Sequence, residues 1–408
     1  MTRRHLLAAA VVAWTLGVTP PMTAQSPVVH LGVDGRGNEH VTAAAAGATV
    51  ALVWAATVPN GATDIYAAMS RDSGATFGAP VRVNATAGQA RVNGEQPPRV
   101  ALVPRPGAGP DVVVVWTARE SAGTRLLTAR SRDGGKTFGA TTVVAGSDAA
   151  GNRGWESLAV TPNGTPIVLW LDHRETAAAS SGHAHGTAHE AAPRADGVAR
   201  AQLSQLFIGA TDGSLPARSL ARGVCYCCKT SLASGPGGAV YAAWRHVYDG
   251  NQRDIAFAAS VDGGRTFRAP ARVSHDRWQI DGCPENGPAL AVDGTRVHVV
   301  WPTLVTERGR ETLKLFHAST TDGRSFSPRA AVPVSGQAYH PQAAAGRGGS
   351  LTVVWDEVAT GGRRIKVWQG GRAIDLGAGI YPTIVSTGTH ALVAWTEGER
   401  IAIRRIPH

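Results

Sequence analysis

Short apolar strands that end in tryptophan recur along the chain and set its organisation. Seven such segments are spaced 40 to 74 residues apart, the length that four short strands and their turns require. Apolar runs of about four to eight residues are separated by Gly, Asn, Asp and Pro, without a convincing helical period. The pattern predicts an all-β propeller of seven four-stranded antiparallel blades. The seven segments are 50–54, 112–116, 166–170, 240–244, 297–301, 351–355 and 391–395.

The last repeat unit is incomplete, and the N-terminus supplies a strand that belongs to no unit. The final unit contains apolar strands at 381–386, 391–395 and 400–406 and lacks a fourth. Residues 27–32 have the pattern of a strand without neighbours in sequence. We therefore expect the N-terminal strand to pair with the final blade and close the ring, which removes an exposed sheet edge.

A second repeat marks a turn within the units. The pattern Ser-x-Asp-x-Gly-x-Thr-aromatic occurs at 70–77, 131–138 and 260–267, and a copy shortened by one residue occurs at 320–326. An Asp carboxylate accepts hydrogen bonds from turn amides, and Gly adopts backbone angles that other residues resist. We interpret the pattern as a tight hairpin turn with the aromatic residue folded beneath it. The carboxylates are those of Asp72, Asp133, Asp262 and Asp322.

This turn pattern resembles the Asp box, or BNR repeat, of sialidases and related β-propellers. The resemblance implies a propeller in which the boxes are structural turns on the face away from the active site. The sialidase fold has six blades, so six is the alternative to the seven counted here. From residue 223 to about 300 the chain also resembles a group of exported bacterial sialidase-like proteins, here with a C-x-C-C cluster.

The N-terminus has the three regions of a signal peptide. Arg3 and Arg4 precede an apolar run over 6–18, and small residues around Ala24 suit cleavage after that position. No later stretch reaches the ~20 apolar residues of a membrane helix. We expect residues 1–24 to be the signal peptide and 25–408 to form one propeller domain, exported to the periplasm or secreted, as a monomer.

Charge and one unusual loop narrow the choice of ligand. The formal charge is +10, but the arginines are scattered singly, which argues against nucleic acid and is compatible with an acidic ligand. Residues from about 176 to 200 form an Ala-, Ser-, Gly- and His-rich insertion that we expect to be a loop. His183, His185 and His189 in this insertion are candidate metal ligands.

The residues just before each predicted inner strand form the main candidate site. The inner strands of a propeller line its axial channel, so the loops that enter them meet at one mouth, and their aromatic and polar side chains suit a concave ligand site. The alternative is that these positions are ordinary loop residues exposed to solvent. They are His40, Glu95, Gln96, Trp155, Glu156, Cys227, Cys228, Lys229, Glu285, Asn286, Tyr339, His340 and Tyr381.

Four cysteines fall in the entry loops of neighbouring units: Cys225, Cys227, Cys228 and Cys283. Two disulfides are the simplest arrangement in an exported chain, with Cys283 tying blade four to blade five. The remaining pair would then lie within four residues, where disulfide geometry is strained. A copper or zinc site built from thiolates and a redox-active thiol pair remain as alternatives.

Sialidases use three arginines, a Tyr nucleophile with a Glu, and an Asp, and that set transfers only in part. The Arg-Ile-Pro element of the family precedes the first Asp box, whereas here it occurs only at 405–407. Tyr381 and Glu285 are the nearest catalytic candidates, with Arg99, Arg153 or Arg245 as carboxylate contacts. The first hypothesis is a binding protein for a small molecule, glycan or metal, with ligand contacts from Trp155, Glu156, Arg245, Asn286, Tyr339 and His340. The alternative is an exo-sialidase or related glycoside hydrolase that acts on acidic sugars.

Overall fold

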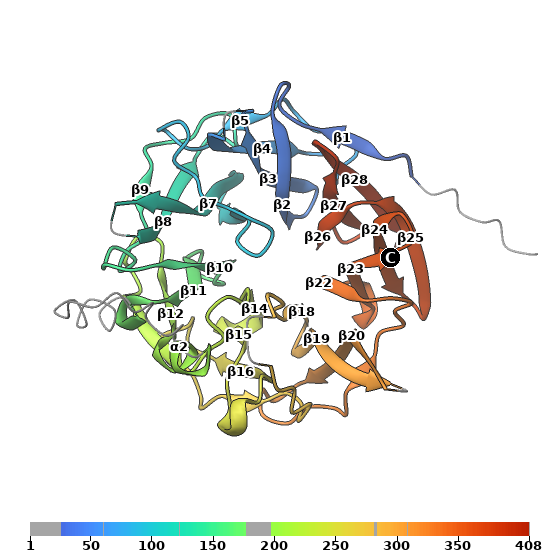
Figure 1. Cartoon of the computed structure of the whole chain (residues 1–408). Coiled ribbons are helices and arrows are strands. Elements are labelled where there is room, and N and C mark those ends of the chain that lie inside the picture. The colour runs from blue at the N-terminus through green and yellow to red at the C-terminus, as the bar shows by residue number, and fades with distance from the viewer. Residues whose placement is uncertain are drawn as a thin grey trace, which may run out of the picture.

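The computed structural model describes residues 26–59, 61–121, 123–176, 197–280, 284–307 and 309–407. Seven four-stranded antiparallel sheets are arranged as blades around a central axis (Figure 1). The predicted propeller and its count of seven blades are confirmed, and the six-blade alternative is wrong. None of the described helices has the length and apolar character needed to cross a membrane.

The blades follow one another along the chain, each running from the axis outward. Blades 1 to 3 are β2 (Gly37–Ala46), β3 (Thr49–Thr57), β4 (Thr63–Ser70), β5 (Val81–Arg82); β6 (Arg99–Arg105), β7 (Ala108–Glu120), β8 (Gly123–Ser131), β9 (Thr142–Val143); and β10 (Arg153–Val160), β11 (Pro166–Asp172), β12 (Gln205–Ala210), β13 (Arg218–Arg222). Blades 4 and 5 are β14 (Ser231–Ser234), β15 (Val240–Arg245), β16 (Ile255–Ser260), β17 (Ala271–Arg272); and β18 (Ala289–Asp293), β19 (Arg296–Glu307), β20 (Arg310–Thr320), β21 (Ala330–Ala331). Blades 6 and 7 are β22 (Ala338–Ala345), β23 (Leu351–Ala359), β24 (Gly362–Gln369), β25 (Arg372–Ala378); and β26 (Ile380–Ser386), β27 (His390–Glu397), β28 (Arg400–Pro407), β1 (Val29–Leu31).

The N-terminal strand closes the ring as expected. β1 pairs antiparallel with β28, and Val29, His30 and Leu31 lie opposite Ile403, Ala402 and Ile401. In Figure 1 the blue N-terminal strand lies beside the red C-terminal strand. The blade that closes the ring is therefore shared between the two ends of the chain, and its outer edge is covered.

Tryptophans on the second strand of every blade form the repeated core. All seven are 0 to 1% exposed, and replacing such a side chain by alanine typically costs about 3–5 kcal/mol. The buried indole N–H needs an acceptor. Trp54 donates to Asn38 Oδ1 at 2.8 Å, and Trp301 donates to Asp276 Oδ2 at 2.7 Å. The tryptophans whose spacing predicted seven blades are thus the residues around which each blade packs.

The repeated turns follow the third strand of blades 1, 2, 4 and 5, on the face opposite the starts of the inner strands. Ser260 ends β16, and its hydroxyl donates to Asp262 Oδ1 at 2.7 Å. The same oxygen accepts the Thr266 amide at 2.9 Å, while Oδ2 accepts the Thr266 hydroxyl at 2.6 Å. Gly264 has φ +86°. Similar contacts surround Asp72, Asp133 and Asp322.

The described part of the chain contains little helix, and α2 is a departure from the sequence analysis. Helix α2 spans Gly197–Leu203 and begins within the insertion that we expected to be a loop. The described residues also include a helical segment at 174–176 and single 3₁₀ turns at Pro236–Gly238, Asp249–Asn251 and Arg347–Gly349. His183, His185 and His189 lie outside the described residues. A seven-residue helix has too few turns to give a helical period.

Candidate functional site

Five non-glycine residues at the starts of inner strands have left-handed backbone conformations. His40, Trp155, Glu285, His340 and Tyr381 have φ between 49° and 59°. Four of the five lie within β-bulges where the first and second strands of a blade shift register. Such backbone strain costs about 1–3 kcal/mol per residue and concentrates at functional sites. All five belong to the mouth that the sequence predicted.

Two cavities that share lining residues lie along the inner strands at this mouth. The outer cavity is about 20 Å³, room for a single water, and the inner one is about 190 Å³. Inner strands of all seven blades line the inner cavity, and both cavities contact Thr42, Arg99, Gln342 and Thr383. The outer cavity is also lined by His40, Gly94, Lys229, His340 and Tyr381. The mouth therefore narrows over a wider axial channel.

Aromatic rings form a continuous row along one side of the mouth. The His340 ring centroid is 4.3 Å from that of Tyr381 and 5.9 Å from that of Tyr339. On the other side of Tyr381 the centroid of His40 is 5.3 Å away. Gly94 permits this packing, because a Cβ there would lie 1.9 Å from the Tyr381 ring. The row supplies flat, half-buried surfaces of the kind that bind sugars and other ring ligands.

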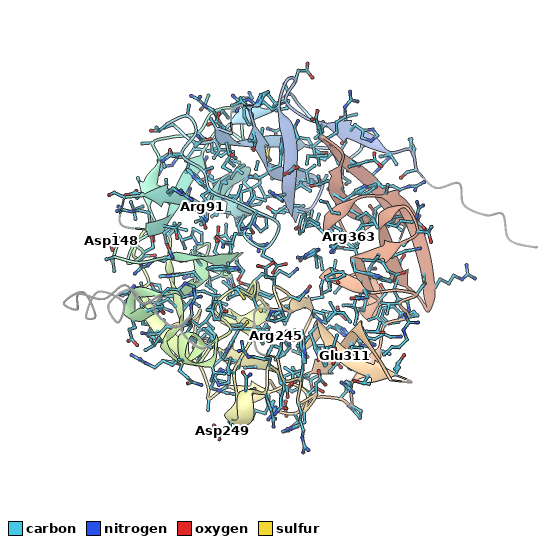
Figure 2. All side chains as sticks on the ribbon, viewed as in Figure 1. Arg91, Asp148, Arg245, Asp249, Glu311 and Arg363 are labelled. Carbon is cyan, nitrogen blue, oxygen red and sulfur yellow. The ribbon has the colours of Figure 1, made fainter. Side chains whose placement is uncertain are left out.

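His340 is held by carboxylates on two sides. Its Nδ1 contacts Asp356 Oδ1 at 2.6 Å, and Arg363 donates to Asp356 Oδ2 at 2.5 Å. Its Nε2 lies 3.4 Å from Glu95 Oε1. Asp356 therefore orients the imidazole so that Nε2 faces Glu95. Arg363, from β24, is labelled in Figure 2 on the inner side of blade 6.

Glu95 and Lys229 are buried charges from different blades. Glu95 is 6% exposed and Lys229 is 3% exposed. Burial raises the pKa of Glu95, while burial lowers the pKa of Lys229 to about 8. Glu95 Oε2 accepts the Lys229 backbone amide at 3.3 Å, and the Lys229 ammonium donates to Pro341 O at 3.2 Å. Glu95 Oε1 is buried without a hydrogen-bond partner.

Arg99 and Glu156 form a second buried group beside the channel. Arg99 Nε donates to the Glu156 carbonyl at 2.7 Å, and the Thr117 hydroxyl donates to Glu156 Oε2 at 3.2 Å. Burial raises the pKa of Glu156 to about 7. Arg99 Nη2 and Glu156 Oε1 are buried without partners. Buried polar atoms are normally hydrogen-bonded, so these two atoms and Glu95 Oε1 mark where a ligand or water would bind.

Two members of the aromatic row, His40 and Tyr381, are held in their neutral forms. Burial and then the charge of His340 lower the pKa of His40 to about 4. Burial, with Glu95 and Asp356 nearby, raises the pKa of Tyr381. At neutral pH the Tyr381 hydroxyl is therefore protonated and able to donate a proton.

The segment Val224–Thr230, which we call the cysteine loop, lies next to the mouth. Cys225 and Cys228 are buried free thiols with their sulfurs 2.8 Å apart. Cys227 Sγ is 3.9 Å from Cys225 Sγ, and Cys283 lies outside the described residues. Burial raises the pKa of Cys225, but contact with Cys228 and the arginines Arg245 and Arg253 bring it to about 7. The pKa of Cys228 is raised.

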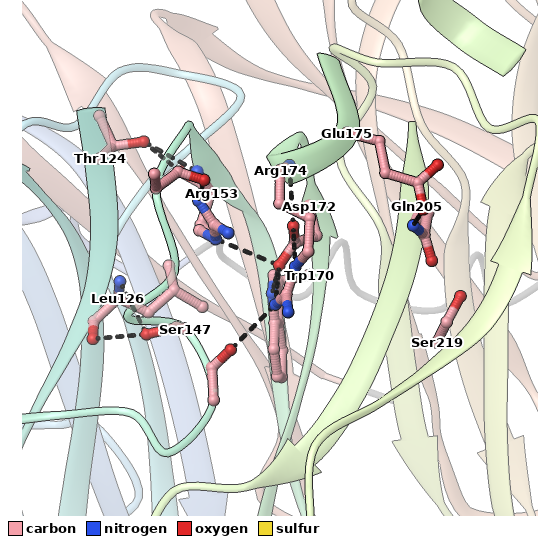
Figure 3. Close-up of polar contacts among 12 residues, drawn as sticks. Thr124, Leu126, Ser147, Arg153, Trp170, Asp172, Arg174, Glu175, Gln205 and Ser219 are labelled. Atoms are coloured by element: carbon pink, nitrogen blue, oxygen red, sulfur yellow. Dashed lines mark hydrogen bonds and ion pairs between the residues drawn. The ribbon is translucent and has the colours of Figure 1, made fainter. Parts of the chain in front are cut away.

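Arg153, one carboxylate-contact candidate, is committed to its own blade. The side chain is 0% exposed, and its Nε donates to Asp172 Oδ2 at 3.1 Å (Figure 3). Its Nη1 donates to Ala150 O at 2.9 Å. Arg174 Nη2 also donates to Asp172 Oδ2, at 2.7 Å. Arg153 therefore pairs with Asp172 instead of reaching the channel cavities.

Arg245 is likewise occupied by backbone carbonyls. It donates to Asn286 O at 3.1 Å, to Arg253 O at 2.5 Å and to Pro302 O at 2.7 Å. Asn286 Oδ1 accepts the His340 amide at 3.3 Å. These contacts brace the loops beneath the mouth. Glu285 is exposed at the mouth, and Trp155 is half-buried against the cysteine loop.

Two residues of the cluster were missed by the sequence analysis. Asp356 follows the core tryptophan Trp355 on β23, and Arg363 begins β24 one hairpin later. Both residues lie on strands outside the inner one, whereas the main candidate site was predicted from residues that precede inner strands. The signal was present in the sequence, because the run Trp355-Asp356-Glu357 places two carboxylates at the end of a buried strand.

Comparisons with known proteins support the fold. No family model matches the chain, and no curated protein matches it in sequence. Among solved structures, a polysaccharide lyase described as an ulvan lyase matches with a TM-score of 0.53 and 10% identity, over 93% of this chain and 96% of the lyase. A Penicillium chrysogenum α-L-arabinanase matches with a TM-score of 0.47 and 12% identity over 91% of this chain and 93% of that one. A Hadza microbial sialidase matches with a TM-score of 0.44 and 13% identity, over 85% of this chain and 73% of the sialidase. The match to the ulvan lyase supports the propeller fold of this chain.

Proposed function

We propose that the protein binds an acidic sugar at the axial mouth and transfers protons to it through Glu95, His340 and Tyr381. The observation that carries this proposal is the strained, incompletely paired cluster at the mouth. Five left-handed residues and three unpaired buried polar atoms surround one channel opening. Strain and unpaired buried groups are unfavourable unless a ligand makes use of them.

The residues present suit acid–base chemistry on a sugar. Asp356 fixes the His340 imidazole, whose Nε2 is the atom nearest Glu95. The raised pKa of Tyr381 keeps its hydroxyl proton in place near neutral pH. Proton transfer by such positioned groups typically contributes about 10²–10⁴-fold to a rate. Tyr381 is the proposed acid, and the Glu95–His340 pair is the proposed proton acceptor.

The charges at the mouth favour a carboxylated sugar over a neutral one. The buried Lys229 and the half-buried Arg99 line the outer cavity, and the buried Nη2 of Arg99 has no hydrogen-bond partner. A carboxylate that accepts from both would satisfy that donor. The three candidate arginines do not form the arginine triad of sialidases, because Arg153 pairs with Asp172 of its own blade and Arg245 donates to backbone carbonyls of blades 4 and 5. We therefore place the carboxylate contacts on Arg99 and Lys229.

Calorimetric titration with N-acetylneuraminate and glucuronate tests the binding step directly. Binding to the wild-type protein, lost in Arg99→Met and kept in Arg105→Met, supports the proposal, since Arg105 lies at the opposite end of β6. Product analysis then uses sialosides and uronate oligosaccharides, with new reducing ends reporting cleavage. No binding of either acid, or equal binding by both variants, contradicts the proposal.

A further inference from the structure

The cysteine loop joins five blades at the mouth. From blade 4, the Cys225 amide donates to Arg245 O at 2.9 Å, which anchors the start of the loop. At its end the Thr230 hydroxyl donates to Trp155 O of blade 3 at 2.8 Å. Between these points Lys229 contacts Glu95 of blade 2 and Pro341 of blade 6.

The same loop packs against blade 5 with no spare room. A Cβ on Gly287 would lie 1.9 Å from the Lys229 carbonyl oxygen. A displacement of the loop by even one bond length would therefore disturb the entry to β18. The position of Lys229, and with it the environment of Glu95, depends on how firmly this short segment is held.

We propose that Cys225 and Cys228 form a disulfide that locks the cysteine loop in this position. The two thiols are in a C-x-x-C arrangement on the same turn, and both are buried, 1% and 2% exposed. Their sulfurs are 2.8 Å apart, so forming a bond of about 2.05 Å requires them to approach by only about 0.8 Å. This site is separate from the proton-transfer groups of the proposed function.

The same distances disfavour a metal between these sulfurs. Zinc–sulfur bonds are about 2.3 Å, and tetrahedral geometry then separates two sulfur ligands by about 3.8 Å. Cys225 and Cys228 are roughly 1 Å closer than that. A metal would have to push the pair apart, and Gly287 and Trp155 leave the loop little space to move. A disulfide needs the smaller change.

The bond forms by thiol–disulfide exchange before the loop is buried. The Cys225 thiolate attacks one sulfur of a disulfide in an oxidising protein, and the displaced sulfur leaves as a thiolate that takes up a proton. The Cys228 thiol loses its proton and attacks Cys225 in the mixed disulfide, which releases the second sulfur of the oxidant. Two thiols of this chain are oxidised and one disulfide of the oxidant is reduced. In the folded protein the buried bond is protected from small reductants.

Disulfide mapping on protein purified from the exported fraction tests the proposal. The protein is alkylated in denaturant without reductant, digested, and fragmented after stepwise reduction. The expected result is a Cys225–Cys228 link, seen as the loss of two hydrogen masses and the absence of alkylation at both positions. Alkylation of both cysteines, a link between either one and another cysteine, or stoichiometric zinc or copper after dialysis would overturn it.

A second experiment asks whether the bond locks the loop. Hydrogen exchange is compared for wild-type protein, wild-type protein reduced after brief unfolding and refolded, and Cys225→Ala/Cys228→Ala. We expect amide exchange within 225–230 to rise by roughly tenfold or more in the last two samples. Exchange over 70–77, a turn on the opposite face, serves as the internal control and should not change. Equal exchange of 225–230 in all three samples would overturn the locking role whether or not the mouth binds a sugar.

Discussion

The two faces of the propeller are built in opposite ways. At the turn after the third strand, glycine supplies the left-handed backbone, as at Gly264, and the Asp262 carboxylate accepts three hydrogen bonds. These hydrogen bonds lower the pKa of Asp262 to about 2 despite the opposing effect of burial. At the mouth, His340 and Tyr381 themselves adopt the left-handed conformation. Glu95 is buried there, its Oε1 has no hydrogen-bond partner, and burial raises its pKa. One face is arranged for stability, and the other carries strain and unpaired charge, as expected of a binding site.

The largest expected effect comes from the mouth. Tyr381→Phe removes the proposed proton donor and keeps the ring in contact with His340, so turnover of an acidic sugar substrate should fall by about 10²-fold or more. Tyr66→Phe, on the third strand of blade 1, is the matched control and should leave turnover unchanged. Steady-state kinetics with thermal unfolding distinguishes lost chemistry from lost structure. Equal turnover by both variants would remove Tyr381 from the mechanism.

A second prediction concerns the pH dependence of stability. Glu156 has a folded-state pKa of about 7, above the ~4.3 of an unfolded glutamate, so folding favours its protonated form. Its contribution is full below about pH 4 and is lost as pH rises toward 7. Glu156→Gln cannot ionise, so the fall in unfolding free energy from pH 5 to pH 8 should shrink by on the order of 2 kcal/mol. Urea unfolding at both pH values measures it, and an unchanged pH dependence would contradict the assigned burial effect.

Removing a turn carboxylate should have a smaller effect, limited to stability. Asp262→Asn keeps one acceptor oxygen and loses the charge, and we expect the Tm to fall by a few degrees, with ligand binding unchanged. Because the folded pKa of Asp262 is below the ~3.9 of a free aspartate, its stabilisation is present above about pH 4 and lost as pH falls toward 2. Asp249→Asn, at an exposed 3₁₀ turn, is the control. A loss of ligand affinity in Asp262→Asn would break the separation between the two faces.

The smallest predicted effect comes from relieving the left-handed backbone strain at Glu285. Glu285 is exposed with φ 49°, and asparagine tolerates that conformation better than glutamate. Glu285→Asn should raise stability by up to about 1 kcal/mol and weaken ligand binding. Ser73→Asn makes the same substitution at φ 59° in a turn on the opposite face, where stability should rise without an effect on binding. If Glu285→Asn leaves binding intact, its strain has no role in the site.

The repeated features were the predictable part of this molecule. The tryptophan period gave the blade count, and the unmatched segment at 27–32 gave the closing strand, because both depend on local patterns of burial and pairing. Comparing the residues that precede each predicted inner strand also placed His340 and Tyr381 in one group. Asp356 and Arg363 escaped because they come from second and third strands, and their approach to His340 depends on bulges that sequence spacing does not show. The commitment of Arg153 and Arg245 to neighbouring carbonyls and to Asp172 was invisible for the same reason.

Hydrogen exchange with and without a bound acidic sugar tests the central claim most directly. The complete protein is compared alone and with an excess of glucuronate or N-acetylneuraminate, whichever binds. Our account predicts protection over 38–42, 94–99, 155–157, 338–342 and 380–383, at the starts of the inner strands, with no change at the turns 70–77, 131–138 and 260–267. Protection at those turns, or none at the mouth, would contradict it.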